Sequence, residues 1–182
     1  IVPGVYAIRD SYVNLYVVKG REGCVAIDAG IEAQVVRDEL KKLGMDPGSV
    51  AAVFLTHSDT DHTGGLSAFP NARIYLSAEE EPMVDGRKSR FFLYRNKAIS
   101  AHESLRDEQE VEVDGVTVRT ILTPGHTPGS ASFLVNGRFL FAVGVADGAA
   151  NRQVSNSTDA TAEPPMTVKL LAREHGGYRA KC

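Results

Sequence analysis

The sequence predicts an α/β fold in which two β-sheets pack together and helices lie on the outside. Segments with strand-like patterns are short, and there are more of them than one open parallel sheet accommodates. Helical periodicity occurs only between some of these segments. The predicted order along the chain is strands, helix, strand, helix, strand and hairpins. We expect residues 1–182 to form a single domain, because no linker-like stretch divides the chain. Side chains at the strand ends should then converge on one edge.

The first third of the chain contains predicted strands and one helix. Strand-like patterns occupy residues 5–8, 13–18 and 24–27. Apolar residues then repeat at the i, i+4, i+7 spacing of a helix, namely Val36, Leu40 and Leu43. Gly44 stands at the position of a helix C-cap. The apolar run 50–55 predicts a strand buried on both faces, and it ends directly before a cluster of His and Asp residues.

The middle of the chain contains a predicted strand, a predicted helix and a polar segment. Residues 73–76 form the strand, and Ser77 with Glu80 forms a capping-box pattern that would open the helix. Residues 85–107 are polar, with basic side chains in the first half. This composition favours a solvated helical excursion, with an anion-binding lid as the alternative.

Two β-hairpins are predicted in the last third of the chain. Their turns are Asp114-Gly115 and Asn136-Gly137, each flanked by apolar strand-like segments. An Asn-Gly or Asp-Gly pair fits the tight turns in which both central residues have positive φ.

Composition excludes several classes of protein. The net charge of −3 gives no field that attracts nucleic acid or an anionic membrane surface. No apolar run reaches the roughly 20 residues of a transmembrane helix, and the first residues do not resemble a signal peptide. Cys24 and Cys182 provide no disulfide framework, which favours a reducing cytoplasm. We therefore expect a cytoplasmic protein without nucleic-acid or membrane partners, and nothing in the sequence indicates an oligomeric state.

The His/Asp cluster predicts a metal site. His57, Asp59, Asp61 and His62 supply two imidazoles and two carboxylates within six residues, and a pair of glycines follows. Such nitrogen and oxygen donors bind divalent cations at about 2.0–2.2 Å when a rigid support holds them. The alternative is a polar loop whose Asp and His side chains only cap the next helix, but four candidate ligands at such close spacing favour the metal site.

His126 is a second candidate ligand. It lies in residues 123–130, where Pro-Gly pairs precede and follow it and restrict the loop. Taken alone, this pattern fits a metal ligand and a hydrogen-bonded loop histidine equally well. The presence of the first cluster in the same chain favours the ligand.

These two segments resemble the motifs of the metallo-β-lactamase superfamily. Residues 56–65 are similar to its signature His-x-His-x-Asp-His-x-Gly-Gly, and residues 123–130 are similar to its Pro-Gly-His-Thr-Pro-Gly block. Asn14 and the triplet Asp28-Ala29-Gly30 also match family landmarks, and the similarity runs over residues 5–144. The resemblance implies an αββα four-layer sandwich with one or two divalent metals at the sheet edge. Zinc is favoured, with iron or manganese as alternatives.

The resemblance also implies two sets of metal ligands. The first would comprise His57, Asp59 and His126, and the second Asp61, His62 and His175. Asp59 stands where the family has its second histidine. A carboxylate is a harder ligand than an imidazole, so this site should tolerate iron or manganese more readily than an all-histidine site.

The later part of the chain departs from the family pattern. Val145 stands where a carboxylate usually bridges the two metals, so double occupancy should be weaker. Asp147 is either a substitute for that carboxylate or an ordinary loop residue. His175 resembles the last family ligand, which usually follows a late strand, and the strand candidate here is residues 167–172. Val168, Leu171 and His175 also fit one face of a helix.

The function that the resemblance implies is metal-dependent hydrolysis of a small ester, thioester, amide or phosphoester. Asp61 would act as a catalytic proton acceptor if the second metal is absent. The alternatives are a mononuclear iron oxygenase resembling persulfide dioxygenases and a degenerate metal-binding protein without catalysis. The substrate, a small molecule, would be selected by loops at residues 82–107 and 146–165.

Overall fold

The computed structural model describes residues 3–84, 99, 101–142 and 166–169. Six strands form the first sheet, in the spatial order β1 (Val5–Asp10), β2 (Val13–Lys19), β3 (Cys24–Ile27), β4 (Val50–Phe54), β5 (Arg73–Ser77) and β6 (Glu103–Leu105). The first three strands pair antiparallel, whereas β3, β4, β5 and β6 run parallel to one another. The carboxyl ends of β3 and β4 therefore lie side by side at one edge.

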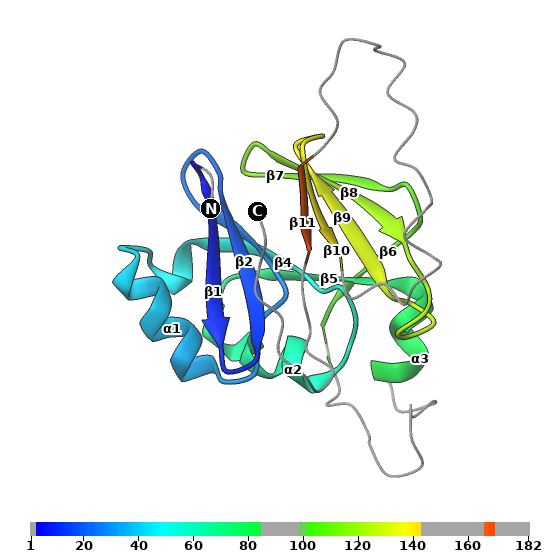
Figure 1. Cartoon of the computed structure of the whole chain (residues 1–182), viewed down its shortest axis with the longest axis horizontal. Coiled ribbons are helices and arrows are strands. Elements are labelled where there is room, and N and C mark those ends of the chain that lie inside the picture. Colours follow the sequence, from blue (N-terminus) through cyan, green and yellow to red (C-terminus); the bar gives the residue numbers. More distant parts are fainter. Residues whose placement is uncertain (1–2, 85–98, 100, 143–165, 170–182) are drawn as a thin grey trace.

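The second sheet has five strands, in the order β11 (Met166–Lys169), β10 (Phe139–Ala142), β9 (Ala131–Val135), β8 (Val116–Leu122) and β7 (Glu110–Val113). Strands β7 to β10 pair antiparallel, and β11 pairs parallel to β10. The two sheets face each other in Figure 1, as the many short strand patterns predict.

The main core fills the space between the two sheets. Tyr16 and Phe54 of the first sheet contact Phe141 and Phe133 of the second, with ring centroids 5.2 and 5.5 Å apart. Phe54 also stacks on Tyr75 with a centroid distance of 4.6 Å. Burial of these aromatic side chains supplies the largest apolar areas that hold the sheets together.

Helices lie on the outer face of the first sheet or at the edge where its parallel strands end. They are α1 (Ala33–Lys42), α2 (Thr60–Thr63), α3 (Glu81–Val84) and the 3-10 helices η1 (Pro47–Ser49), η2 (Gly64–Ala68) and η3 (Ala78–Glu80). Val36 and Leu40 of α1 are fully buried in a second core on this face. Leu43, expected on the same apolar face, is 44% exposed because it is the C-cap, and Gly44 follows with φ of +72°. No helix in the described ranges is long and apolar enough to span a bilayer.

Both predicted hairpin turns are confirmed. Asp114 and Gly115 have φ of 53° and 78°, and Asn136 and Gly137 have φ of 52° and 62°. Positive φ at both residues is the reason why the sequence needs an Asx-Gly pair there.

The predicted capping box is wrong. Ser77 does accept a hydrogen bond from a backbone N–H, but the donor is Glu79, 3.1 Å away, rather than Glu80. The side chain of Glu80 is completely buried and turns away from the helix start, toward two loops that are distant in sequence. A short 3-10 turn followed by α3 therefore replaces the regular helix start that the pattern predicts.

Candidate metal centre

The segment that carries the His/Asp cluster leaves the carboxyl end of β4 and crosses toward the second sheet. Its first residues remain tied to the first sheet, since Leu55 N donates to Tyr75 O over 2.9 Å. Thr56 O then accepts from Ala131 N of β9 over 2.8 Å. This backbone bond brings the cluster next to the β8–β9 loop, which carries His126.

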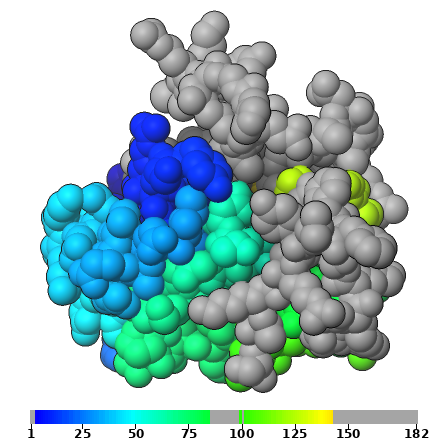
Figure 2. Space-filling model, turned by 90° about the horizontal axis from the view of Figure 1, so that it is seen from below, coloured from blue at the N-terminus to red at the C-terminus, as the bar shows by residue number. Residues whose placement is uncertain are grey.

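The two glycines after the cluster are required by close backbone approach. A Cβ on Gly64 would lie 2.3 Å from Ile31 O, and one on Gly65 would lie 2.0 Å from Ala29 O. The loop between β3 and α1 thus packs directly on the backbone after His62. Ala29 N also donates to His62 O over 2.8 Å, which fixes the position of α2. Seen from below, the β1–β2 hairpin, α1 and the segment around α2 form one continuous face (Figure 2).

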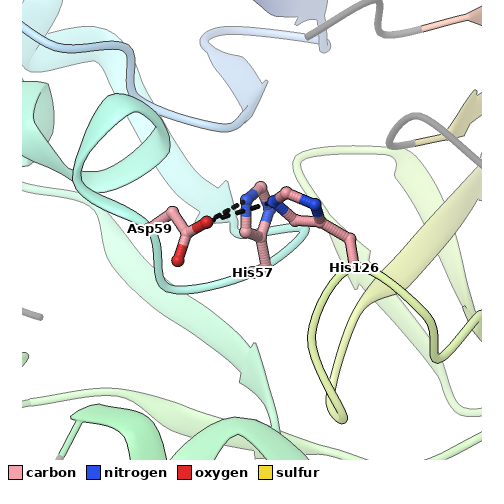
Figure 3. A group of neighbouring side chains, drawn as sticks. All are labelled: His57, Asp59 and His126. Atoms are coloured by element: carbon pink, nitrogen blue, oxygen red, sulfur yellow. Dashed lines mark hydrogen bonds and ion pairs between the residues drawn. The ribbon is translucent and has the colours of Figure 1, made fainter. Parts of the chain in front are cut away.

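The first group of candidate ligands joins His57, Asp59 and His126. One donor atom of each lies within 4.8 Å of the others. Oδ2 of Asp59 is 3.5 Å from His57 Nε2 and 3.1 Å from His126 Nε2, so both rings point toward one carboxylate oxygen (Figure 3). The rings of His57 and His126 meet edge to face, with centroids 4.6 Å apart.

The second group joins His57, Asp61 and His62, again with donor atoms within 4.8 Å of one another. His62 Nε2 is 3.7 Å from Asp61 Oδ2, and the rings of His57 and His62 are 4.3 Å apart. His57 therefore belongs to both groups. His175, predicted in this second set, lies outside the described residues.

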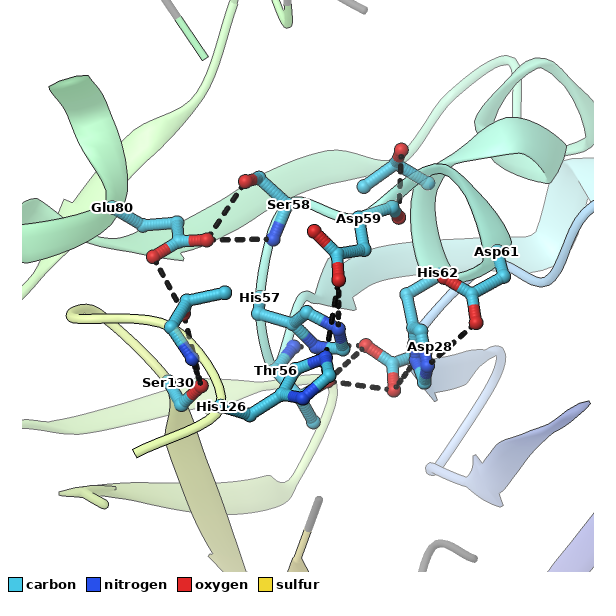
Figure 4. Close-up of polar contacts among 12 residues, drawn as sticks. Asp28, Thr56, His57, Ser58, Asp59, Asp61, His62, Glu80, His126 and Ser130 are labelled. Atoms are coloured by element: carbon cyan, nitrogen blue, oxygen red, sulfur yellow. Dashed lines mark hydrogen bonds and ion pairs between the residues drawn. The ribbon is translucent and has the colours of Figure 1, made fainter. Parts of the chain in front are cut away.

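A buried carboxylate, Asp28, orients the two buried histidines (Figure 4). His62 Nδ1 is 2.7 Å from Asp28 Oδ2, and Thr56 Oγ1 lies 2.8 and 2.9 Å from the two oxygens of Asp28. An ionised carboxylate only accepts, so His62 donates through Nδ1–H. Thr56 gives its one hydroxyl proton to Asp28 and accepts from His57 Nδ1 over 3.1 Å. Both rings consequently direct Nε2 toward the candidate ligand groups.

The environments of the two histidines shift their pKa values in opposite directions. Burial lowers the pKa of His57 below its ordinary value, and this effect exceeds that of the nearby carboxylates. Burial also acts to lower the pKa of His62, but the charges of Asp28, Asp61 and Asp59 together raise it above its ordinary value. The neutral form of His57, in which an imidazole binds a metal, is therefore favoured.

A divalent cation fits these residues. Nε2 of His57 and Nε2 of His62 are buried and, within the described ranges, have no hydrogen-bond partner. Leaving a buried polar atom without a partner is costly, and a metal ion at Nε2 would satisfy both atoms. The surrounding carboxylates of Asp59 and Asp61 supply the negative charge that such an ion requires.

The structure brings together five of the six predicted ligands, and their role as ligands stays a prediction. Val145, Asp147 and His175 lie outside the described residues. In the sequence, Asp28 stands out only as part of a family landmark, and the spacing of Ser77 and Glu80 indicates a helix cap. One sequence signal does point to Asp28. It is a short polar side chain directly after a buried strand, and the neighbouring strand ends at the His/Asp cluster.

Comparison with known proteins assigns the chain to a family. Residues 8–144 match the family model described as the metallo-beta-lactamase superfamily, and the chain belongs to this superfamily. A metallo-β-lactamase of Cronobacter sakazakii with a HARLDQ motif has the same fold, with a TM-score of 0.71 and 24% identity over 81% of this chain and 58% of that one. The predicted fold class is thereby confirmed.

The named relatives are hydrolases. The probable polyketide biosynthesis zinc-dependent hydrolase BaeB of Bacillus velezensis is 30% identical over 69% of this chain and 51% of its own length. The hydroxyacylglutathione hydrolase of Chromohalobacter salexigens is 30% identical over 93% of this chain and 64% of its own length. The chain thus spans only about half to two thirds of the length of these two relatives.

Proposed function

We propose that the chain is a metal-dependent hydrolase of a small ester, thioester, amide or phosphoester, with zinc as the favoured metal. One observation carries the proposal. His57, Asp59 and His126 come from segments that follow strands of two different sheets, yet their donor atoms lie within 4.8 Å of one another, and His57 Nε2 is buried without a hydrogen-bond partner among the described residues. The names of the relatives BaeB and hydroxyacylglutathione hydrolase support this class of reaction.

The candidate ligands form a buried side and a solvent-accessible side of the site. His57 and His62 are 0% and 2% exposed, whereas the side chains of Asp59, His126 and Asp61 are 18%, 23% and 25% exposed. His57, Asp59 and His126 would hold the first cation, and Asp61 with His62 a second. A divalent ion held in such a site lowers the pKa of bound water to about 7 and polarises a carbonyl or phosphoryl group.

Asp61 is the residue suited to accept a proton. Its side chain is 25% exposed, more than that of Asp59 or His126, and its Oδ2 lies 3.7 Å from His62 Nε2. If only one metal is bound, the carboxylate of Asp61 would be available to accept a proton at the open side of the site. Asp61→Asn should then lower kcat while the first metal is retained.

The test is metal content and hydrolysis measured together. Protein purified without chelators is analysed by mass spectrometry for bound metal and assayed on p-nitrophenyl acetate, an acyl thioester and bis(p-nitrophenyl) phosphate. His126→Ala should lose metal and activity, whereas His102→Ala, a histidine outside both ligand groups, should lose neither. If chelation changes neither activity nor thermal stability, catalysis by this centre is excluded and a degenerate site remains.

An iron-dependent oxygenase is the second candidate. The first group consists of two imidazoles and one carboxylate, the ligand set of non-haem iron oxygenases. Iron-loaded protein assayed on a persulfide with and without oxygen separates the two reactions. Oxygen consumption that depends on iron would favour the oxygenase, and hydrolysis that is unaffected by removal of oxygen would favour the hydrolase.

A further inference from the structure

Glu80 lies between the two loops that supply the first ligand group (Figure 4). It belongs to η3, directly after β5, and its side chain is completely buried. It is neither a candidate ligand nor part of a helix cap, as shown above. A buried carboxylate needs several donors to compensate for the loss of water, so its partners indicate what holds it there.

Each carboxylate oxygen of Glu80 accepts hydrogen bonds from one loop. Oε1 accepts from Ser58 N over 3.0 Å and from Ser58 Oγ over 2.7 Å. Oε2 accepts from Thr127 Oγ1 over 2.8 Å and from Gly129 N over 3.1 Å. Gly129 packs so closely that a Cβ there would lie 2.4 Å from Glu80 N. The carboxylate therefore links the cluster after β4 to the β8–β9 loop.

The residues that Glu80 holds are the sequence neighbours of the candidate ligands. Ser58 separates His57 from Asp59, and Thr127 directly follows His126. We propose that Glu80 is a positioning residue, which sets the spacing of the three ligands through Ser58 on one side and the His126 loop on the other. This inference rests on the proposed metal centre.

The charge of Glu80 makes this link stiff. In the part of the chain that the structure describes, no cationic side chain forms an ion pair with Glu80, so its charge is compensated by the four hydrogen bonds. Hydrogen bonds to an ionised acceptor are shorter and stronger than neutral ones. Movement of either loop would leave a buried charge with too few donors, and the loops are thereby held at a fixed separation.

The decisive variant is Glu80→Gln, with Glu79→Gln as the matched control. The glutamine is isosteric, but its NH2 group must face one of the two backbone donors, Ser58 N or Gly129 N, so that loop loses its backbone hydrogen bond and keeps only the contact of its hydroxyl. Glu79 is exposed on the same turn and loses the same charge. The affinity for Zn²⁺ is measured by competition with a chromophoric chelator, and the Co²⁺-loaded protein is recorded in the visible range, where the absorption reports ligand geometry.

We expect Glu80→Gln to bind Zn²⁺ about 10- to 100-fold more weakly, as for other residues that orient metal ligands. Its Co²⁺ bands should also shift, whereas Glu79→Gln should match the wild type in both measurements. A folded Glu80→Gln protein with wild-type affinity and an unchanged Co²⁺ spectrum would overturn the positioning role.

Thr127→Val keeps the test decisive if Glu80→Gln does not fold. Valine is similar in shape to threonine and removes one of the four donors, so the loss of Zn²⁺ affinity should be smaller but in the same direction. A stable Thr127→Val protein with wild-type affinity would also overturn the role. Failure of the wild-type chain to bind Zn²⁺ would instead refute the metal centre itself, and the positioning role with it.

Discussion

His62 Nδ1 lies 2.7 Å from Oδ2 of Asp28, and both side chains are buried. The same carboxylate accepts from the Thr56 hydroxyl, which in turn contacts His57 Nδ1. One aspartate therefore determines which nitrogen of each buried histidine faces the candidate metal groups. Any change at Asp28 should affect both groups at once.

Asp28→Asn should reduce both stability and metal affinity. Asp28 has φ of +62°, a conformation that asparagine also tolerates, so the backbone should be preserved. The loss of a hydrogen bond to a charged group should lower the free energy of unfolding by about 1.5–3 kcal/mol, and Zn²⁺ affinity should fall about 10- to 100-fold. Chemical denaturation and chelator competition measure the two effects.

Asp10→Asn is the matched control for Asp28→Asn. Asp10 is also buried and accepts from the backbone N–H groups of Ile31 and Glu32, each over 2.7 Å, but among the described residues it contacts no candidate ligand. It should lose stability while Zn²⁺ affinity remains unchanged. Equal losses of affinity in the two variants would show that Asp28 acts only through stability.

Asp59→His should shift the metal preference toward zinc. The substitution restores the histidine of the family signature and replaces a hard oxygen donor by an imidazole nitrogen. The ratio of Zn²⁺ to Mn²⁺ affinity, measured by competition, should rise. Asp38→His adds a histidine to the exposed surface of α1 and controls for nonspecific binding. If the ratio of Zn²⁺ to Mn²⁺ affinity is the same in Asp59→His and Asp38→His, Asp59 is not a metal ligand.

Val145→Asp should raise the occupancy of the second metal. A carboxylate at this position would offset the repulsion between two neighbouring dications. Metal content per chain, determined by mass spectrometry after saturation with Zn²⁺ and gel filtration, should increase relative to the wild type. Val145 lies outside the described residues, so this expectation rests on the sequence motif, and an unchanged metal content would place the bridging position elsewhere.

In the metal-free chain, His57 and His62 should titrate on opposite sides of their ordinary pKa of 6.5. Burial favours the neutral form of His57, whereas Asp28 favours the protonated form of His62. Because the pKa of His62 is raised by folding, its contribution to stability is complete below pH 6.5 and is lost as the pH rises through the raised pKa. Histidine NMR resonances, assigned with His62→Asn, measure both values; the reverse order would contradict the network.

The fold was largely predictable from the sequence because its signals are local. Apolar alternation identified the strands, and the Asp114-Gly115 and Asn136-Gly137 turns adopt the positive φ values that their residue types indicate. The proximity of His57 and His126 followed from matching two motifs rather than from any local signal. They lie in loops that follow strands of different sheets, and no period in the sequence relates them.

The role of Glu80 shows where local reasoning fails. Ser77 and Glu80 have the spacing of a capping box, and an isolated helix would use it. In the folded chain, the carboxylate instead accepts hydrogen bonds from four donors of Ser58, Thr127 and Gly129. These donors lie 22 to 49 residues away in sequence, so their competition was invisible before the fold was known.

Gly129→Ala and Gly125→Ala test whether the His126 loop needs its close contact with η3. A Cβ at position 129 would lie 2.4 Å from Glu80 N and 2.7 Å from Glu79 C, both backbone atoms that cannot move cheaply, whereas one at position 125 meets nothing within 4 Å. Gly129→Ala should therefore cost about 1–3 kcal/mol of stability, as overpacking does, and should displace His126 and weaken Zn²⁺ binding. Gly125→Ala, on the other side of His126, should stay within about 0.5 kcal/mol of the wild type. Equal thermal stability and Zn²⁺ affinity in the two variants would show that the loop does not depend on this contact.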